Sequence, residues 1–177
     1  ALEKAKVVVS LGRDFLGEPG AISEARGFAA GRKVRGGKAA ETEMNRLYVI
    51  ESMMTITGGA ADHRLRLKPS DAVGVSLALL KAVLEKSGRG DLAGSVTGAN
   101  AHGQESWVDA AADDLVASRG ACAVMAGESM PAGVHALVCA EGYDPELGSF
   151  TQAFGSRLLD GALLQLPLVG FLPSTDE

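Results

Sequence analysis

Glycines and polar residues gather at four places where the sequence predicts the end of a strand or the start of a helix. These places are residues 12–14, 51–57, 68–71 and 127–131. In open parallel sheets, ligands bind beyond the carboxyl ends of the strands, where backbone amides and polar side chains can hold phosphates and other polar groups. We therefore expect any binding or catalytic chemistry of this chain at these four places.

Three sequence motifs with known chemistry are approached but not completed. The run GESMP, which ends at Pro131, departs from the nucleophile turn G-x-S-x-G at its last position. His135 lies too close to be the separate base of a catalytic triad. The loop after the first predicted strand offers only Gly12 and Gly17 to a G-x-G-x-x-G dinucleotide fingerprint, and the surroundings of Lys38 fail the phosphate-binding loop at two positions. We therefore assign no catalytic residue.

The charge balance excludes one large class of partner. The chain has 177 residues and a formal net charge of −5, from 17 Lys and Arg against 22 Asp and Glu. A domain that binds nucleic acid through its phosphates needs the opposite sign, so we expect no nucleic-acid partner. A basic stretch within residues 26–38 is interpreted as solvated surface, with an anionic ligand or partner as the alternative.

The sequence also predicts neither a metal site nor a membrane span. Cys122 and Cys139 are too few for an iron–sulfur cluster or a zinc site built on thiolates, and the three histidines lack ligand spacing. The apolar stretch at residues 163–172 is interrupted by Gln, Pro and Gly and is too short to cross a bilayer. The chain begins at Ala1 and enters a strand almost at once, which we interpret as the sign of a piece of a longer polypeptide.

The alternation of strand and helix patterns predicts the fold. We predict strands at residues 7–11, 47–51, 64–68 and 121–126, and helices at about 21–30, from 70 onward, at 105–118 and at 132–141. This order is typical of an α/β three-layer sandwich with a mostly parallel, Rossmann-like sheet. We expect the domain to cover residues 1–148, with an internal connector at 87–104. A C-terminal extension follows at 149–177, which either folds with the domain or docks on a neighbouring protein.

One stretch carries a family resemblance. Residues 47–71 read LYVIESMMTITGGAADHRLRLKPSD, which resembles the second α/β domain of molybdopterin oxidoreductases of the dimethyl-sulfoxide-reductase type. The upstream VVVSLGRDFLGEPG resembles the strand-Gly-x-Asn-Pro loop of that family, with Asp14 and Phe15 in place of Asn and Pro. The segments MNRLYVIES and ADHRL are similar in sequence to the fused molybdopterin-oxidoreductase-like and iron–sulfur subunit of bacterial alternative complex III.

The resemblance implies three functional hypotheses. The leading one is a structural and interaction domain in a membrane-associated, quinol-oxidising electron-transfer complex, with iron–sulfur and membrane subunits as partners and a periplasmic location. The chain alone would then hold no cofactor and be catalytically silent. The alternatives are the guanosine-binding domain of an active molybdopterin-dependent oxidoreductase and a free-standing nucleotide-binding module. The residues that the resemblance places at the guanosine end of a molybdopterin guanine dinucleotide are Gly12, Asp14, Glu51, Ser52, Thr55 and Asp71.

The same side chains also have a purely structural interpretation. Asp71 can cap a helix, Glu51 can be a surface charge at a strand end, and Thr55 and Thr57 can bond the loop backbone. We interpret Asp62 as a turn carboxylate that accepts backbone amides.

Overall fold

Four parallel strands form the central sheet of the structure, a computed structural model that describes residues 2–33, 43–135, 138, 143–144 and 149–150. The strands are β1 (Val7–Leu11), β2 (Arg46–Glu51), β3 (His63–Arg66) and β4 (Cys122–Ala126). Their spatial order is β3-β2-β1-β4, and every neighbouring pair runs parallel. The predicted α/β fold with a parallel, Rossmann-like sheet is confirmed.

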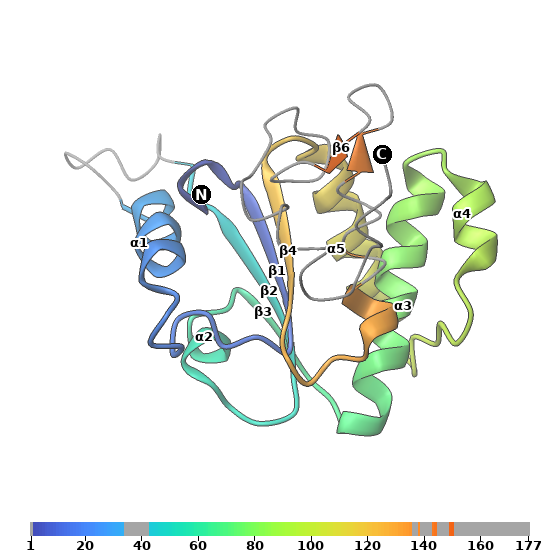
Figure 1. Ribbon diagram of the computed structural model, residues 1–177, viewed down its shortest axis with the longest axis horizontal. Helices are drawn as coiled ribbons and strands as arrows, with labels where there is room; N and C mark the ends of the chain where they lie inside the picture. The colour runs from blue at the N-terminus through green and yellow to red at the C-terminus, as the bar shows by residue number, and fades with distance from the viewer. Residues whose placement is uncertain (1, 34–42, 136–137, 139–142, 145–148, 151–177) are drawn as a thin grey trace.

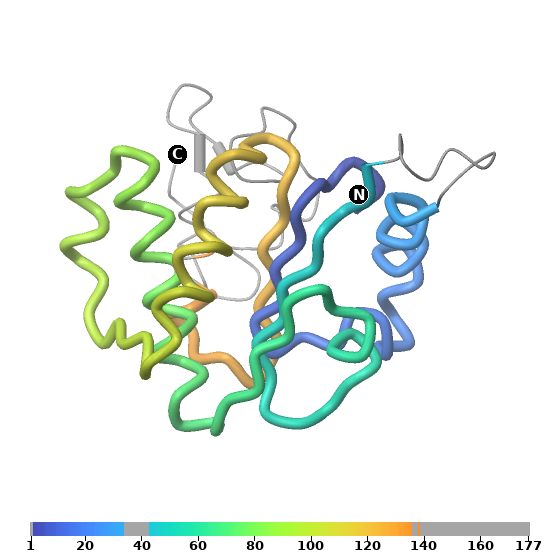
Figure 2. The backbone as a smooth tube through the Cα atoms, turned by 180° about the vertical axis from the view of Figure 1, so that it is seen from behind, coloured from blue at the N-terminus to red at the C-terminus, as the bar shows by residue number. Residues whose placement is uncertain are grey.

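Helices cover both faces of this sheet (Figure 1). The helical elements are η1 (Leu2–Lys4), α1 (Ile22–Gly31), α2 (Ile56–Gly59), α3 (Pro69–Lys86), α4 (Gly90–Ser95) and α5 (Glu105–Ala117). Helices α1 and α2 lie on one side, whereas α3 and α5 lie on the other and α4 packs outside α3, as the reverse view also shows (Figure 2). A separate antiparallel pair joins β5 (Tyr143–Asp144) and β6 (Ser149–Phe150).

The alternation of side chains along β1 builds two cores. Val8 contributes to the core under α1, together with Phe15 and Phe28, while its neighbours Val7 and Val9 contribute to the core under α3 and α5. Successive side chains of a strand point to opposite faces, so a central strand covered by helices is buried on both faces. This arrangement explains why the five residues of β1 are all buried, whereas the edge strand β3 is polar and partly exposed.

Two short helices were not expected from the sequence. Helix α2 lies between the strands predicted at 47–51 and 64–68, where no helix was predicted, and α4 lies inside the predicted connector at 87–104. Each has six residues or fewer, so neither shows a helical repeat of apolar residues. Helix α4 is held by a small core of Leu84, Ala93 and Val96. Of the helix predicted at 132–141, residues 132–135 and 138 are described and are helical, whereas the rest of that range lies outside the described residues. The extension at 149–177 lies outside them except for residues 149 and 150.

Candidate functional site

The carboxyl ends of β1, β2 and β3 lie at one edge of the sheet, and α2 begins beside them. Asp14 follows β1 and points toward α2, where its Oδ1 accepts a hydrogen bond of 2.8 Å from the Thr57 amide. Burial alone would raise the pKa of the Asp14 carboxyl, but hydrogen bonds from the backbone and side chain of Thr57 hold it below its ordinary value. Asp14 is therefore an ionised carboxylate at the start of α2.

Glu51, the last residue of β2, is buried and makes three close contacts. Its Oε1 forms an ion pair with Nε of Arg64, and its Oε2 accepts a hydrogen bond of 2.6 Å from the Thr55 hydroxyl. The Thr55 hydroxyl in turn accepts the Gly58 amide at 2.9 Å and so caps α2. Gly58 packs so closely on Glu51 that any Cβ atom there would collide with the carboxylate. Glu51 is therefore a buried ion-pair partner and not a surface charge.

The glycines of the β1 and β4 loops meet where the strand order reverses. Gly12 adopts a φ of 71°, a left-handed conformation that favours glycine. A Cβ atom on Gly127 would lie 2.6 Å from the carbonyl carbon of Gly12, so only glycine fits there. The side chain of the buried Met130 covers Gly12 from the other direction, with its terminal methyl 2.9 Å from where a Cβ of Gly12 would lie. In sheets of this topology ligands usually bind at this point, and here the Met130 side chain lies against Gly12.

The remaining predicted residues lie apart from the Glu51 contacts. Ser52 is partly exposed in the loop after β2. Asp71 lies in the first turn of α3, accepts a hydrogen bond of 2.9 Å from Ser70 and faces Nδ1 of His102 at 4.0 Å. It makes no capping hydrogen bond, because the cap position of α3 is Lys68. The structure thus brings Asp14, Glu51 and Thr55 together around α2, while Asp71 has different partners.

Sequence reasoning missed the partners of these groups. Arg64 lies opposite Val49 in the parallel register of β2 and β3, so its side chain can reach the end of β2. The alternation of β3 shows that Arg64 is half-buried but does not identify its partner. Asp62 fulfils its predicted role, because its Oδ2 accepts the Leu47 amide at 2.7 Å. Burial would raise the pKa of Asp62, but a hydrogen bond from Arg32 and that amide lower it.

Over the described ranges, no three His, Cys, Asp or Glu side chains come together as a metal ion would require. Over the same ranges, none of the helices is both long and apolar enough to cross a bilayer.

Comparison with known proteins gives only short similarities. No protein-family model matches the chain. A trehalase from Thermoplasma acidophilum is 48% identical over 40 residues, which is 23% of this chain and 7% of the trehalase. A trehalase from Thermoplasma volcanium is also 48% identical over 40 residues, which is 23% of this chain and 6% of the trehalase. The chain therefore matches less than a tenth of the length of either relative.

These similarities contradict the resemblance to molybdopterin oxidoreductases and to the subunit of alternative complex III. The matched proteins are trehalases, and none of the matches is to a molybdopterin protein. The resemblance depended on the order of short motifs in a strand-loop-strand segment, and many unrelated parallel sheets share that order. The cofactor, electron-transfer partners and periplasmic location followed from that resemblance alone and stay predictions without support.

Proposed function

We propose that the described α/β unit is a structural and interaction domain of a larger protein. One observation carries the proposal: Asp14, Glu51 and Thr55, at the carboxyl edge of the sheet, are bonded to neighbouring protein groups. Glu51 pairs with Arg64 and Thr55, and Asp14 takes the Thr57 amide. These contacts hold the loops after β1 and β2 and the strand β3 in one rigid arrangement.

A phosphate or nucleotide ligand would have to break those contacts. Backbone amides at a helix start bind phosphates only when they are free to donate. The Thr57 and Gly58 amides of α2 already donate to Asp14 and to the Thr55 hydroxyl. An incoming phosphate would also be repelled by the Asp14 carboxylate. This carboxylate is ionised, because the effect of burial is outweighed by hydrogen bonds from Thr57, which lower its pKa. The arrangement supports a scaffold more than a nucleotide site.

Calorimetric titration of the 177-residue chain with guanosine diphosphate tests this proposal. We expect no saturable heat, with circular dichroism confirming that the sample is folded. The matched variants are Asp14→Asn, which removes the carboxylate that opposes a phosphate, and Asp71→Ala, which removes the predicted guanosine contact. Saturable binding by the wild type that is weakened in Asp71→Ala would contradict the proposal and favour the nucleotide-binding alternative.

The match to the two trehalases favours a second candidate, namely that the chain is a segment of a protein that hydrolyses trehalose. Because the match covers 6–7% of those proteins, this activity would belong to a longer polypeptide. A coupled glucose assay with trehalose, run on the chain and on any longer polypeptide that contains it, tests this candidate. Glucose release by the longer polypeptide would support it, and a longer polypeptide that leaves trehalose intact would contradict it.

A further inference from the structure

Four large apolar side chains are exposed at the carboxyl edge of the sheet. Met53 is 79% exposed, Met54 is 68%, Ile56 is 63% and Ile22 is 58%. Met53 and Met54 lie between β2 and α2, Ile56 is the first residue of α2, and Ile22 begins α1 just after the β1 loop. We call these four residues the carboxyl-edge patch. Exposed apolar side chains that gather at one place, unlike single scattered ones, mark an interaction surface.

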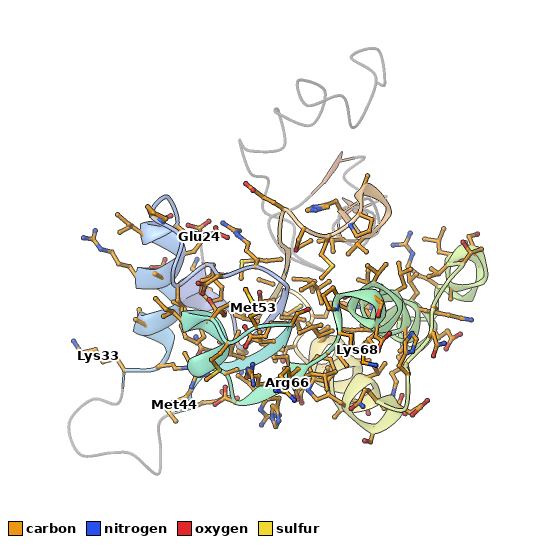
Figure 3. The ribbon with its side chains drawn as sticks, turned by 90° about the horizontal axis from the view of Figure 1, so that it is seen from below. Glu24, Lys33, Met44, Met53, Arg66 and Lys68 are labelled. Atoms are coloured by element: carbon orange, nitrogen blue, oxygen red, sulfur yellow. The ribbon has the colours of Figure 1, made fainter. Side chains whose placement is uncertain are left out.

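Charges of opposite sign flank the patch. On the α1 side, Glu18 and Glu24 share a single cation, because both contact Arg13, at 3.0 and 3.4 Å. On the β3 side, the side chains of Arg66 and Lys68 are exposed and have no ion-pair or hydrogen-bond partner within the described ranges. In the view from below, Met53 lies between Glu24 on one side and Arg66 and Lys68 on the other (Figure 3). One flank therefore carries excess negative charge and the other free positive charge.

This arrangement is complementary to itself. A two-fold axis through the patch would place the apolar side chains of two copies against each other. The same rotation would bring the acidic flank of each copy onto the basic flank of the other, so every attractive contact would form twice. We propose that two copies of this chain associate through the carboxyl-edge patch, with Glu24 of each copy near Lys68 of the other.

The charge pattern favours a second copy over other occupants. An anionic membrane or a nucleic acid would be attracted by Arg66 and Lys68 but repelled by Glu24, which lies across the same patch. A partner must present apolar side chains between one acidic and one basic flank. A second copy does this by symmetry. The inference deepens the proposed function, on which it rests, by naming the partner of the interaction domain.

Sedimentation velocity over a wide range of chain concentration tests the association. We expect the wild type to pass from monomer to dimer as concentration rises. Glu24→Lys places a lysine opposite Lys68 of the other copy, and Lys68→Glu places a glutamate opposite Glu24, so each variant should self-associate about tenfold more weakly or worse, because two attractive contacts per dimer become repulsive. A mixture of the two variants should form dimers again, since residues 24 and 68 then carry opposite charges at both contacts. Recovery in the mixture also shows that both variants are folded.

Matched substitutions at the opposite end of the strands provide controls. Met44, which is 52% exposed just before β2, and Lys33, which is exposed after α1, carry the same chemistry away from the patch. We expect Met53→Glu to abolish the dimer, and Met44→Glu and Lys33→Glu to leave it intact. A wild type that stays monomeric at every concentration overturns the inference, as does a dimer that the control variants weaken equally.

Failure of this inference is distinguishable from failure of the proposed function. A monomeric chain that is silent toward guanosine diphosphate overturns only the self-association. Saturable binding of guanosine diphosphate overturns the scaffold function whatever the oligomeric state.

Discussion

Neutralising Glu51 should destabilise the domain more than neutralising any surface carboxylate. The Glu51 side chain is 4% exposed and that of Arg64 is 27%, so the pair is largely withdrawn from water. Glu51→Gln keeps the size of the side chain and an oxygen for the Thr55 hydroxyl, but it leaves the Arg64 guanidinium without its counter-charge. Removing one partner of a buried pair typically costs about 3–5 kcal/mol, and partial exposure of Arg64 reduces our expectation to about 2–3 kcal/mol.

A double-mutant cycle separates this ion pair from side effects of each substitution. Arg64→Met retains the aliphatic part of the side chain, so the cycle Glu51→Gln with Arg64→Met isolates the charge interaction. We expect a coupling energy of about 1.5 kcal/mol or more, within the range for residues in direct contact. The control cycle uses Lys6 and Glu43, whose side chains are 58% and 76% exposed, and should give less than about 0.5 kcal/mol.

Urea unfolding followed by Trp107 fluorescence and circular dichroism measures both cycles, because Trp107 is the one tryptophan of the chain. The loss expected for Glu51→Gln corresponds to a fall of about 4–12 °C in Tm for a chain of this size. If Glu51→Gln costs no more than Glu43→Gln, or if the two coupling energies are equal, the buried pair does not hold the carboxyl edge together and our account of the site is wrong.

Three further predictions concern a glycine contact and two titrations. Gly127→Ala forces a Cβ atom against the Gly12 backbone and should cost about 3 kcal/mol by urea unfolding, whereas Gly94→Ala, in open space, should be neutral or slightly stabilising; equal effects would contradict the packing argument. Burial is the main cause that raises the pKa of Tyr48 to about 12, so one of the two tyrosines should form phenolate near pH 12. The contribution of Tyr48 to stability should be lost as pH rises from 10.0 toward 12. Ultraviolet titration would refute this if both tyrosines ionise near pH 10.0 in the folded chain. The effect of burial is outweighed by hydrogen bonds from Arg32 and the Leu47 amide, which hold the pKa of Asp62 below its ordinary value of 3.8, so its contribution to stability is present above pH 3.8 and lost as pH falls below it. Asp62→Asn should therefore be less stable than wild type at neutral pH and approach it in acid.

The strands and long helices could be predicted because their local patterns are strong. The run VVVSL requires burial on both faces, and it forms β1 with the predicted bounds. The 13-residue helix α5 ends one residue before its predicted end. Helices α2 and α4 could not be predicted, because neither is long enough to show a repeat and both are stabilised by contacts with distant elements.

The candidate site was only half visible in the sequence. Asp14, Glu51 and Thr55 could be singled out because they follow predicted strands, where the ends of parallel strands converge. Their partners could not be identified, because the contact between Glu51 and Arg64 depends on the lateral register of β2 and β3. The family assigned from the order of short motifs was wrong, because unrelated parallel sheets share the same order of strands and loops.

The sequence by itself determined the four strands of the sheet, the long helices, the parallel sheet and the edge at which polar groups gather, because hydrophobic periodicity acts over a few neighbouring residues. Only the tertiary structure decided that Glu51 is an internal ion-pair partner, that Met130 covers Gly12, and that Met53 lies between flanks of opposite charge. Each of these features joins residues far apart in the chain, and their distances are set by how strands and helices pack.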